Sequence, residues 1–204
     1  MAKLSLEARN KLHFVAHGVR LAYPKLFEPE TNTLNGREEF SCQIRFYKSN
    51  PEHMKQVEQI RELLKYAAKV HWGDDAERNY RSAIDSKNTR WLREDDEGEY
   101  FVVSLKRRAQ DGAPRLVHRD RTIALRQEDG KLYSGVIVNA VFDIWCYSGV
   151  AKNGQKIPCG FSATLGGVQF VADADPLGGA RVAKDDDFED LGTDGIEDNG
   201  DDFF

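Results

Sequence analysis

Basic and aromatic side chains recur at alternate positions of three segments that have the composition of β-strands. Apolar residues fill the positions between them, so the basic and aromatic side chains share the face opposite the expected core. Cations can follow a phosphate backbone, and aromatic rings can stack on bases of any identity. The pattern therefore predicts a surface for single-stranded DNA made by seven residues: Arg45, Tyr47, Tyr100, Lys106, Arg108, Trp145 and Tyr147.

The aromatic residues also have a simpler interpretation, which is packing beneath a loop or a helix. Trp145 and Tyr147 stand apart because an apolar set already fills the other face of their segment. For Trp72 and Trp91 we favour packing in the core or under a loop. The cluster Lys106-Arg107-Arg108 has the alternative of a solvated run that protects a strand edge. We favour contact with DNA for this cluster.

An enzyme would need a different pattern, and the main rival is a metal-dependent nuclease with paired carboxylates. Asp143 lies among the aromatic residues of the third segment, but no second carboxylate is placed on a strand to pair with it. Residues 94–97, all acidic, have the composition of a solvated loop. The chain also contains no phosphate-binding loop, nucleophile elbow or zinc-protease motif. We expect no catalytic residues, and the nuclease stays open as an alternative.

The cysteines and histidines do not suggest a metal site or a disulfide framework. Cys42, Cys146 and Cys159 include no C-x-x-C pair, and the five histidines do not stand at zinc-ligand spacing from them. An odd number of cysteines fits thiols kept reduced in a cytoplasm. No apolar segment is long enough to span a membrane or to form a secretory signal. We expect a cytoplasmic protein without metal, cofactor or membrane partner.

Strands must position the predicted binding residues, and their ends are set by turn residues. Tyr23-Pro24 is expected to close the first strand, with Phe27-Glu28-Pro29 in a loop and Asn35-Gly36 in a turn. Asn153-Gly154 is a strong hairpin signal between two later strands. The expected strands cover residues 12–23, 38–48, 99–108, 133–147, 156–163 and 168–171.

One helix interrupts the strands. Asn50 and Pro51 suit its first turn, and Trp72-Gly73 its end. Between them, apolar residues recur at steps of three and four, as in an amphipathic helix that seals a core. Residues 74–98 are expected to form a charged surface loop with a short helix. The predicted fold class is mainly β, an OB-fold-like antiparallel barrel with one amphipathic helix, and a β-sandwich is the alternative.

The charge of the chain is segregated. Its formal net charge is −5, but residues 185–204 hold eight Asp, two Glu and no Lys or Arg, which is −10. Subtracting −10 from −5 leaves the first 184 residues at +5. A basic body with an acidic tail points to nucleic acid. We expect residues 1–180 to form the DNA-binding body and residues 181–204 a disordered acidic tail.

The tail ends in Phe203-Phe204, two aromatic residues after a run of acids. A tail that only improved solubility would not need them. We expect Phe203 and Phe204 to bind an apolar pocket, rimmed by basic residues, on a replication protein such as a polymerase or helicase. An interaction adaptor, in which the tail is the whole function and the body a scaffold, is a further alternative.

Three segments carry a resemblance to a known family. They are Gly18–Phe27, Leu132-Tyr133-Ser134-Gly135, and Gly167–Asp173 followed by Pro176-Leu177-Gly178-Gly179. In order and spacing they resemble a family of single-stranded-DNA-binding proteins of tailed bacteriophages, and they cover most of residues 12–180. The resemblance implies an OB-fold, sequence-tolerant binding of single strands and a role in phage DNA replication or recombination. It also makes self-association on DNA worth testing. The charged stretch 74–98 is not covered by it.

Overall fold

The structure is a computed structural model that describes residues 5–33, 36–85, 91–150 and 156–178. The described residues form seven strands, three α-helices and three short 3-10 turns. The strands are β1 (His13–Thr31), β2 (Glu38–Tyr47), β3 (Arg93–Glu94), β4 (Tyr100–Arg108), β5 (Arg115–Val117), β6 (Ile137–Val150) and β7 (Lys156–Ala172). The helices are α1 (Leu6–Lys11), α2 (Pro51–Trp72) and α3 (Ala76–Asp85).

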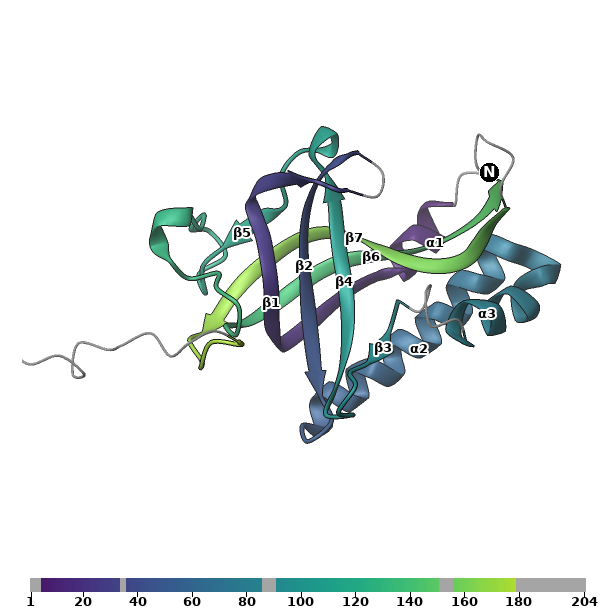
Figure 1. The fold of residues 1–204 in the computed structure, drawn as a ribbon, viewed down its shortest axis with the longest axis horizontal. Coiled ribbons are helices and arrows are strands. Elements are labelled where there is room, and N and C mark those ends of the chain that lie inside the picture. The colour runs from purple at the N-terminus through teal and green to yellow at the C-terminus, as the bar shows by residue number, and fades with distance from the viewer. Residues whose placement is uncertain (1–4, 34–35, 86–90, 151–155, 179–204) are drawn as a thin grey trace, which may run out of the picture.

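The strands close into a barrel. Their order is β3-β4-β2-β1-β6-β7-β5, and an additional pairing joins β4 to β7. This last pairing is parallel, with Lys106 opposite Thr164, and it closes β1, β2, β4, β6 and β7 into a five-stranded ring (Figure 1). The predicted OB-fold-like barrel is therefore confirmed, and the β-sandwich alternative is wrong because its two sheets would not pair along this edge.

The two-residue alternation of the strands decides what is buried. On β2, Phe40, Cys42, Ile44 and Phe46 point inward and are buried, as predicted. The even-numbered residues of β6 are buried in the same way: Val138, Ala140, Phe142, Ile144 and Cys146. Because inner positions are filled with apolar side chains, the polar and aromatic residues between them must face outward.

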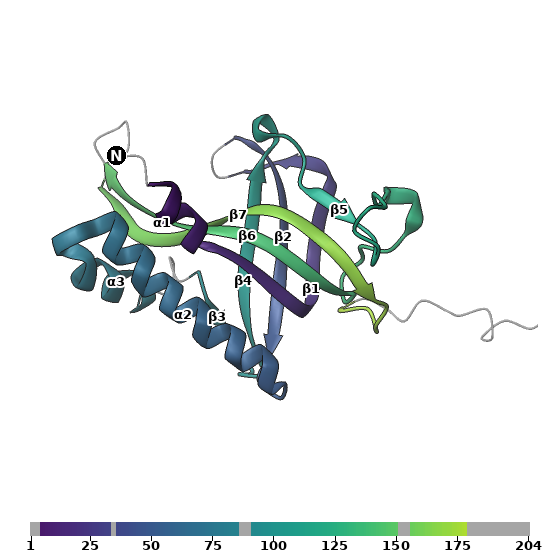
Figure 2. The ribbon, with the colours of Figure 1, turned by 180° about the vertical axis from the view of Figure 1, so that it is seen from behind.

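Helix α2 has the predicted bounds and the predicted buried face. The side chain of Asn50 accepts a hydrogen bond from the backbone N–H of Glu52 and caps the first turn, and Gly73 ends the helix at a positive φ. Val57, Ile60, Leu64 and Ala67 are buried against the barrel. Figure 2 shows α2 running from the end of β2 towards the far ends of β6 and β7.

The outer halves of β6 and β7 project beyond the barrel, and we call residues 144–150 and 156–163 the arm (Figures 1 and 2). Helices α2 and α3 cover one side of it. The ring of Phe161 lies 5.4 Å from that of Trp72 and 5.9 Å from that of Tyr80. Trp145 and Tyr147 lie on the side of the arm away from Phe161, where Trp145 also lines a hollow beside α1.

Two strand boundaries differ from the prediction. The first strand does not end at Tyr23-Pro24, and Phe27-Glu28-Pro29 is not a loop, because β1 continues to Thr31. Ala22 pairs with Gln43 but Lys25 with Ser41, so β1 holds one extra residue there, a β-bulge. A proline is tolerated at a bulge because its missing N–H is not required for the ladder.

The last two predicted strands are one. β7 runs without interruption from Lys156 to Ala172 and pairs antiparallel with β6, which begins at Ile137 rather than residue 133. Gly167 does not break the strand but lets β5 approach, since a Cβ there would lie 2.5 Å from the carbonyl oxygen of Arg115. The short strand β5 is absent from the prediction. The Asn153-Gly154 turn lies outside the described residues.

The charged stretch 74–98 contains α3 and β3 as well as the expected surface turns. The tryptophans are placed as predicted. Trp91 is buried, donates its indole N–H to the carbonyl oxygen of Ser104 at 2.7 Å and packs on Phe142. Trp72 packs on the core cluster. No described helix has both the length and the apolar composition needed to cross a bilayer.

The segments that carry the family resemblance meet at one end of the barrel. Gly135, at a φ of 116°, donates its N–H to the carbonyl oxygen of Leu21 and packs against the backbone of residues 175–177. The hydroxyl of Tyr133 accepts a hydrogen bond from the N–H of Ala174. These motifs therefore hold the barrel end together. Apart from Tyr23 of the first segment, the side chains that line the two hollows described below come from other positions.

Candidate nucleic-acid interface

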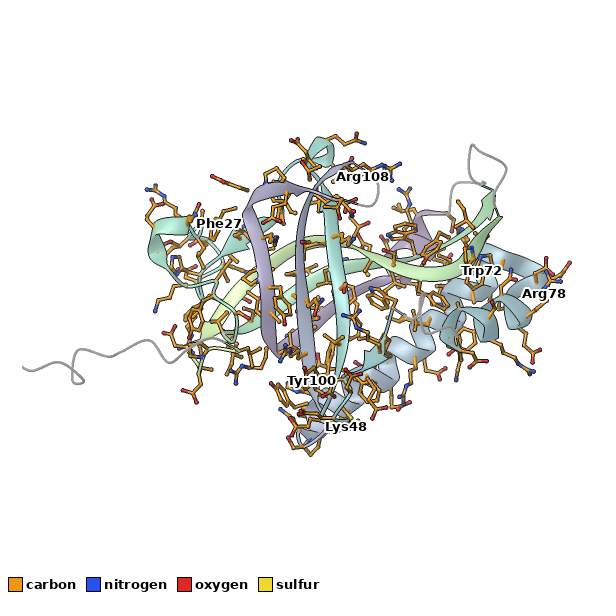
Figure 3. All side chains as sticks on the ribbon, in the orientation of Figure 1. Phe27, Lys48, Trp72, Arg78, Tyr100 and Arg108 are labelled. Carbon is orange, nitrogen blue, oxygen red and sulfur yellow. The ribbon has the colours of Figure 1, made fainter. Side chains whose placement is uncertain are left out.

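The outer face of β2 and β4 brings five of the predicted binding residues onto neighbouring strands. In the antiparallel register Tyr47 lies opposite Tyr100. Arg45, two residues before Tyr47 on β2, lies opposite Val102. Lys106 and Arg108 follow towards the other end of β4. Figure 3 shows Tyr100 and Arg108 at opposite ends of this strand. The predicted face therefore exists, but its cationic and aromatic residues gather at its two ends rather than along its whole length.

The first gathering lies between the end of β4 and the arm. Here a hollow of about 660 Å³, which we call the arm hollow, is lined by four of the predicted residues: Lys106, Arg108, Trp145 and Tyr147. Arg37, from the connection between β1 and β2, and Thr164 of β7 also line it. Barrel closure produces this arrangement, because pairing Lys106 with Thr164 places the basic end of β4 beside the arm.

Two aromatic rings form one wall of the arm hollow. The centroids of the Trp145 and Tyr147 rings are 6.0 Å apart, with their planes inclined by 60°. Trp145 is 38% exposed, a high value for a tryptophan whose strand neighbours Ile144 and Cys146 are buried. Burial raises the pKa of the Tyr147 phenol, which strengthens the preference of this side chain for its uncharged form. A base can stack here.

The basic cluster at the end of β4 divides into two roles. The side chain of Lys106 reaches into solvent, with Glu39 at 3.7 Å from its ammonium, and Arg108 is exposed. Arg107 instead donates hydrogen bonds to the carbonyl oxygens of Gly112 and Asp111 at 2.6 Å and of Leu165 at 3.2 Å. Arg107 therefore holds the following turn against β7. Arg108 and Lys106 are the cations left for a ligand, although Lys106 also forms an ion pair with Glu39. Glu39 and Asp111 line the hollow beside them.

The second gathering lies at the opposite end of the β2–β4 face. A hollow of about 540 Å³, which we call the strand hollow, is lined by Arg45 and Tyr100 of the prediction and by Tyr23, Gln43 and Arg93. The guanidinium of Arg45 lies over the Tyr100 ring, 4.5 Å from its centroid. The Tyr47 ring packs on the same tyrosine at 5.4 Å. Burial raises the pKa of the Tyr100 phenol.

The acidic residues considered for a metal site are occupied otherwise. The carboxylate of Asp143 lies within hydrogen-bond distance of Nδ1 of His13, at 2.9 Å, and lines a further hollow beside α1. Glu94 pairs with Lys48, and the carboxylate of Asp95 accepts a hydrogen bond from the N–H of Tyr100 at 2.8 Å. Across the described ranges no three His, Cys, Asp or Glu side chains are grouped so that they could hold a metal ion.

Two arginines and a tyrosine that line these hollows are absent from the prediction. Arg37 and Arg93 lie outside the predicted strands, where the sequence pattern does not show in which direction a side chain points. Tyr23 was assigned to the end of a strand because a proline follows it. The Tyr-Pro pair does not reveal this by itself, since proline occurs at strand ends as well as at bulges, where side chains are re-aimed.

Fold and surface together define the chain as an OB-fold protein with a cationic, aromatic outer face on the second and third barrel strands, the face that OB-folds use for oligonucleotides. Residues 12–204 match the family described as the single-stranded-DNA-binding protein of Enterobacter phage Enc34. The chain belongs to this family. It is also 34% identical over 178 residues to the putative protein p50 of Acyrthosiphon pisum secondary endosymbiont phage 1, covering 86% of this chain and 91% of that protein.

Solved structures share the fold at low sequence identity. The single-stranded DNA-binding protein of bacteriophage Enc34, solved in complex with single-stranded DNA, aligns with a TM-score of 0.62 and 21% identity over 82% of this chain and 90% of that chain. The bacteriophage T7 protein gp2.5, also a single-stranded DNA-binding protein, aligns with a TM-score of 0.51 and 16% identity, covering 92% and 96% of the two chains. Both comparisons support the OB-type barrel.

Proposed function

We propose that this protein binds single-stranded DNA without sequence preference, and that it acts in phage DNA replication or recombination in the cytoplasm of an infected bacterium. The observation that carries the proposal is the arm hollow, where two cations from β4 face two aromatic rings from the arm. Cations that follow phosphates, combined with rings that stack on bases, are what sequence-tolerant single-strand binding requires.

Family membership supports the proposal. The matched family is named for single-stranded-DNA binding, and one structural relative was solved with single-stranded DNA bound. Neither name refers to catalysis, which fits a binding protein rather than an enzyme. A metal-dependent nuclease would need a second carboxylate beside Asp143, but the partner of Asp143 is a histidine, His13.

The acidic tail adds a second part to the proposal. Residues 185–204 carry −10 against +5 for the rest of the chain. A tethered polyanion reaches a high effective concentration near a basic surface, so it competes with DNA for that surface. Binding of DNA displaces the tail and frees Phe203-Phe204 to recruit a replication protein, such as a polymerase or helicase. Self-association on DNA would extend this arrangement along a strand.

A titration tests the proposed function directly. Fluorescence polarisation with labelled single-stranded and double-stranded oligonucleotides, repeated over a range of salt concentrations, should show preference for single strands and weakening with salt. Equal affinity for both forms, or none, would contradict the proposal. Incubating nicked and intact DNA with the protein and Mg²⁺ tests the nuclease alternative in the same experiment, and we expect no cleavage.

A further inference from the structure

Tyr23 has an unusual backbone and an unusual exposure for an aromatic residue. Its φ is 48°, and no other non-glycine residue of the described ranges has a positive φ. Its side chain is 62% exposed although it belongs to a barrel strand whose neighbours Leu21 and Ala22 are fully buried. Glycine would adopt this conformation without strain. A strained, exposed tyrosine suggests that the side chain itself is used.

The β1 bulge places Tyr23 beside the strand hollow. Strands β4, β2 and β1 are consecutive neighbours in the barrel, and each contributes at least one residue to the hollow. Tyr100 comes from β4, Arg45 from β2 and Tyr23 from β1, and all three line the hollow. The result is an aromatic ring, a guanidinium and a second aromatic ring on three adjacent strands.

The charges around the strand hollow restrict how DNA can enter it. Four consecutive acidic residues line the hollow and repel phosphate: Glu94, Asp95, Asp96 and Glu97. Tyr23 also lines the hollow, and Lys25, two residues further along β1, is exposed and forms an ion pair with Glu30. Therefore a strand would present a base to the rings and keep its backbone away from the acidic residues.

We propose that Tyr23, Arg45 and Tyr100 form a second base-binding site, which takes an unpaired base of the same DNA strand that occupies the arm hollow. This inference rests on the proposed function and adds a second contact to it. Tyr100 and Lys106 are six residues apart on β4, which corresponds to about 20 Å of strand. Only an oligonucleotide long enough to span that distance can reach both sites.

The test compares two lengths of oligothymidylate, about 2 nucleotides, too short to span both sites, and about 16, the upper end of what single OB-folds cover. Tyr23→Gly removes the ring and relieves the backbone, and Tyr23→Phe is the matched control that keeps the ring. For Tyr23→Gly we expect affinity for the long oligonucleotide to fall by about 5- to 150-fold, the loss of one stacked base. Affinity for the short one should not change, because it fits in the arm hollow alone.

Thermal unfolding supplies a second readout. Tyr23→Gly should unfold at the same or a higher temperature than the unmodified protein, because the strain at φ 48° is removed. Tyr23→Phe should bind both lengths normally. If Tyr23→Gly does not fold, Tyr23→Asn replaces it, since asparagine tolerates a positive φ.

Two results would overturn the inference. One is a Tyr23→Gly protein that binds the long oligonucleotide as tightly as the unmodified protein does. The other is an equal loss for both lengths, which would place Tyr23 in a single common site. Failure of the proposed function looks different, because then the unmodified protein itself binds neither oligonucleotide, and the second site falls with it.

Discussion

The ring of Tyr147 lies directly across Gly160 on the neighbouring strand. The two residues are paired in the β6–β7 register, and a Cβ added at Gly160 would overlap the Cζ and the hydroxyl oxygen of the tyrosine. The missing side chain at Gly160 is therefore what allows the ring to lie flat along the arm, beside Trp145.

Gly160→Ala should weaken binding to single-stranded DNA, because the added methyl group displaces the Tyr147 ring from the wall of the arm hollow. We expect a loss of up to about 1–3 kcal/mol, the value of one stacked base, measured by fluorescence polarisation. In a double-mutant cycle the effect should vanish in a Tyr147→Ala background. A Gly160→Ala effect that persists there would mean that the glycine acts elsewhere.

Trp145→Ala should also lower affinity by about 1–3 kcal/mol without unfolding the protein. The tryptophan projects from the side of the arm away from Phe161 and contributes little to the core. Oligothymidylate should quench the tryptophan fluorescence of the unmodified protein, and this quenching should be lost in Trp145→Phe, which retains a ring. Trp145→Ala protein that no longer folds cooperatively would place the residue in the core instead.

The salt dependence of DNA binding should distinguish the basic residues that we expect to contact DNA from a neighbouring arginine that should not. Lys106→Gln, Arg108→Gln and Arg45→Gln should each weaken all sequences alike and lower the slope of log affinity against log salt by about one. Arg107→Gln is the internal control, because its guanidinium fastens a turn to β7. It should lower the unfolding temperature and leave the slope close to that of the unmodified protein. A sequence-dependent loss in the first three variants would point to base readout.

Truncation after Lys184 removes all ten carboxylates of the tail and both terminal phenylalanines. The shortened protein should bind single strands more tightly, most visibly at low salt, where charges are least screened. It should also lose binding to its replication partner. Tail competition is wrong if affinity at low salt is unchanged. The recruitment role is wrong if a protein lacking only Phe203 and Phe204 still binds the partner.

The faces of the strands could be predicted from the sequence, because a side chain's direction in a strand depends only on whether its position is odd or even. The buried set of β2 and the exposure of Trp145 follow from this alone. The bounds of α2 were equally accessible, since Asn50, Pro51 and Gly73 are local signals.

Contacts between distant strands could not be predicted in this way. The alternation of residues along one strand does not reveal that Lys106 lies beside Thr164. The proximity of the β4 cations to the aromatic residues of the arm can therefore be seen only in the closed barrel. Likewise the sequence does not distinguish Arg107 from Arg108. Only its hydrogen bonds to three carbonyl oxygens show that Arg107 stabilises the fold. Tyr23 was missed because a proline in a bulge has the same local signature as one that ends a strand.

The parallel pairing of Lys106 with Thr164 is also the weakest junction between neighbouring strands of the closed barrel. The other junctions of the ring are ladders of many residues, whereas this one has a single register pair among the described strands. If DNA binds in the arm hollow as proposed, it would contact both β4 and β7 at this junction and should make transient opening of the barrel less frequent. Amide hydrogen exchange would show this as added protection along the facing edges of β4 and β7, including residues that DNA never contacts.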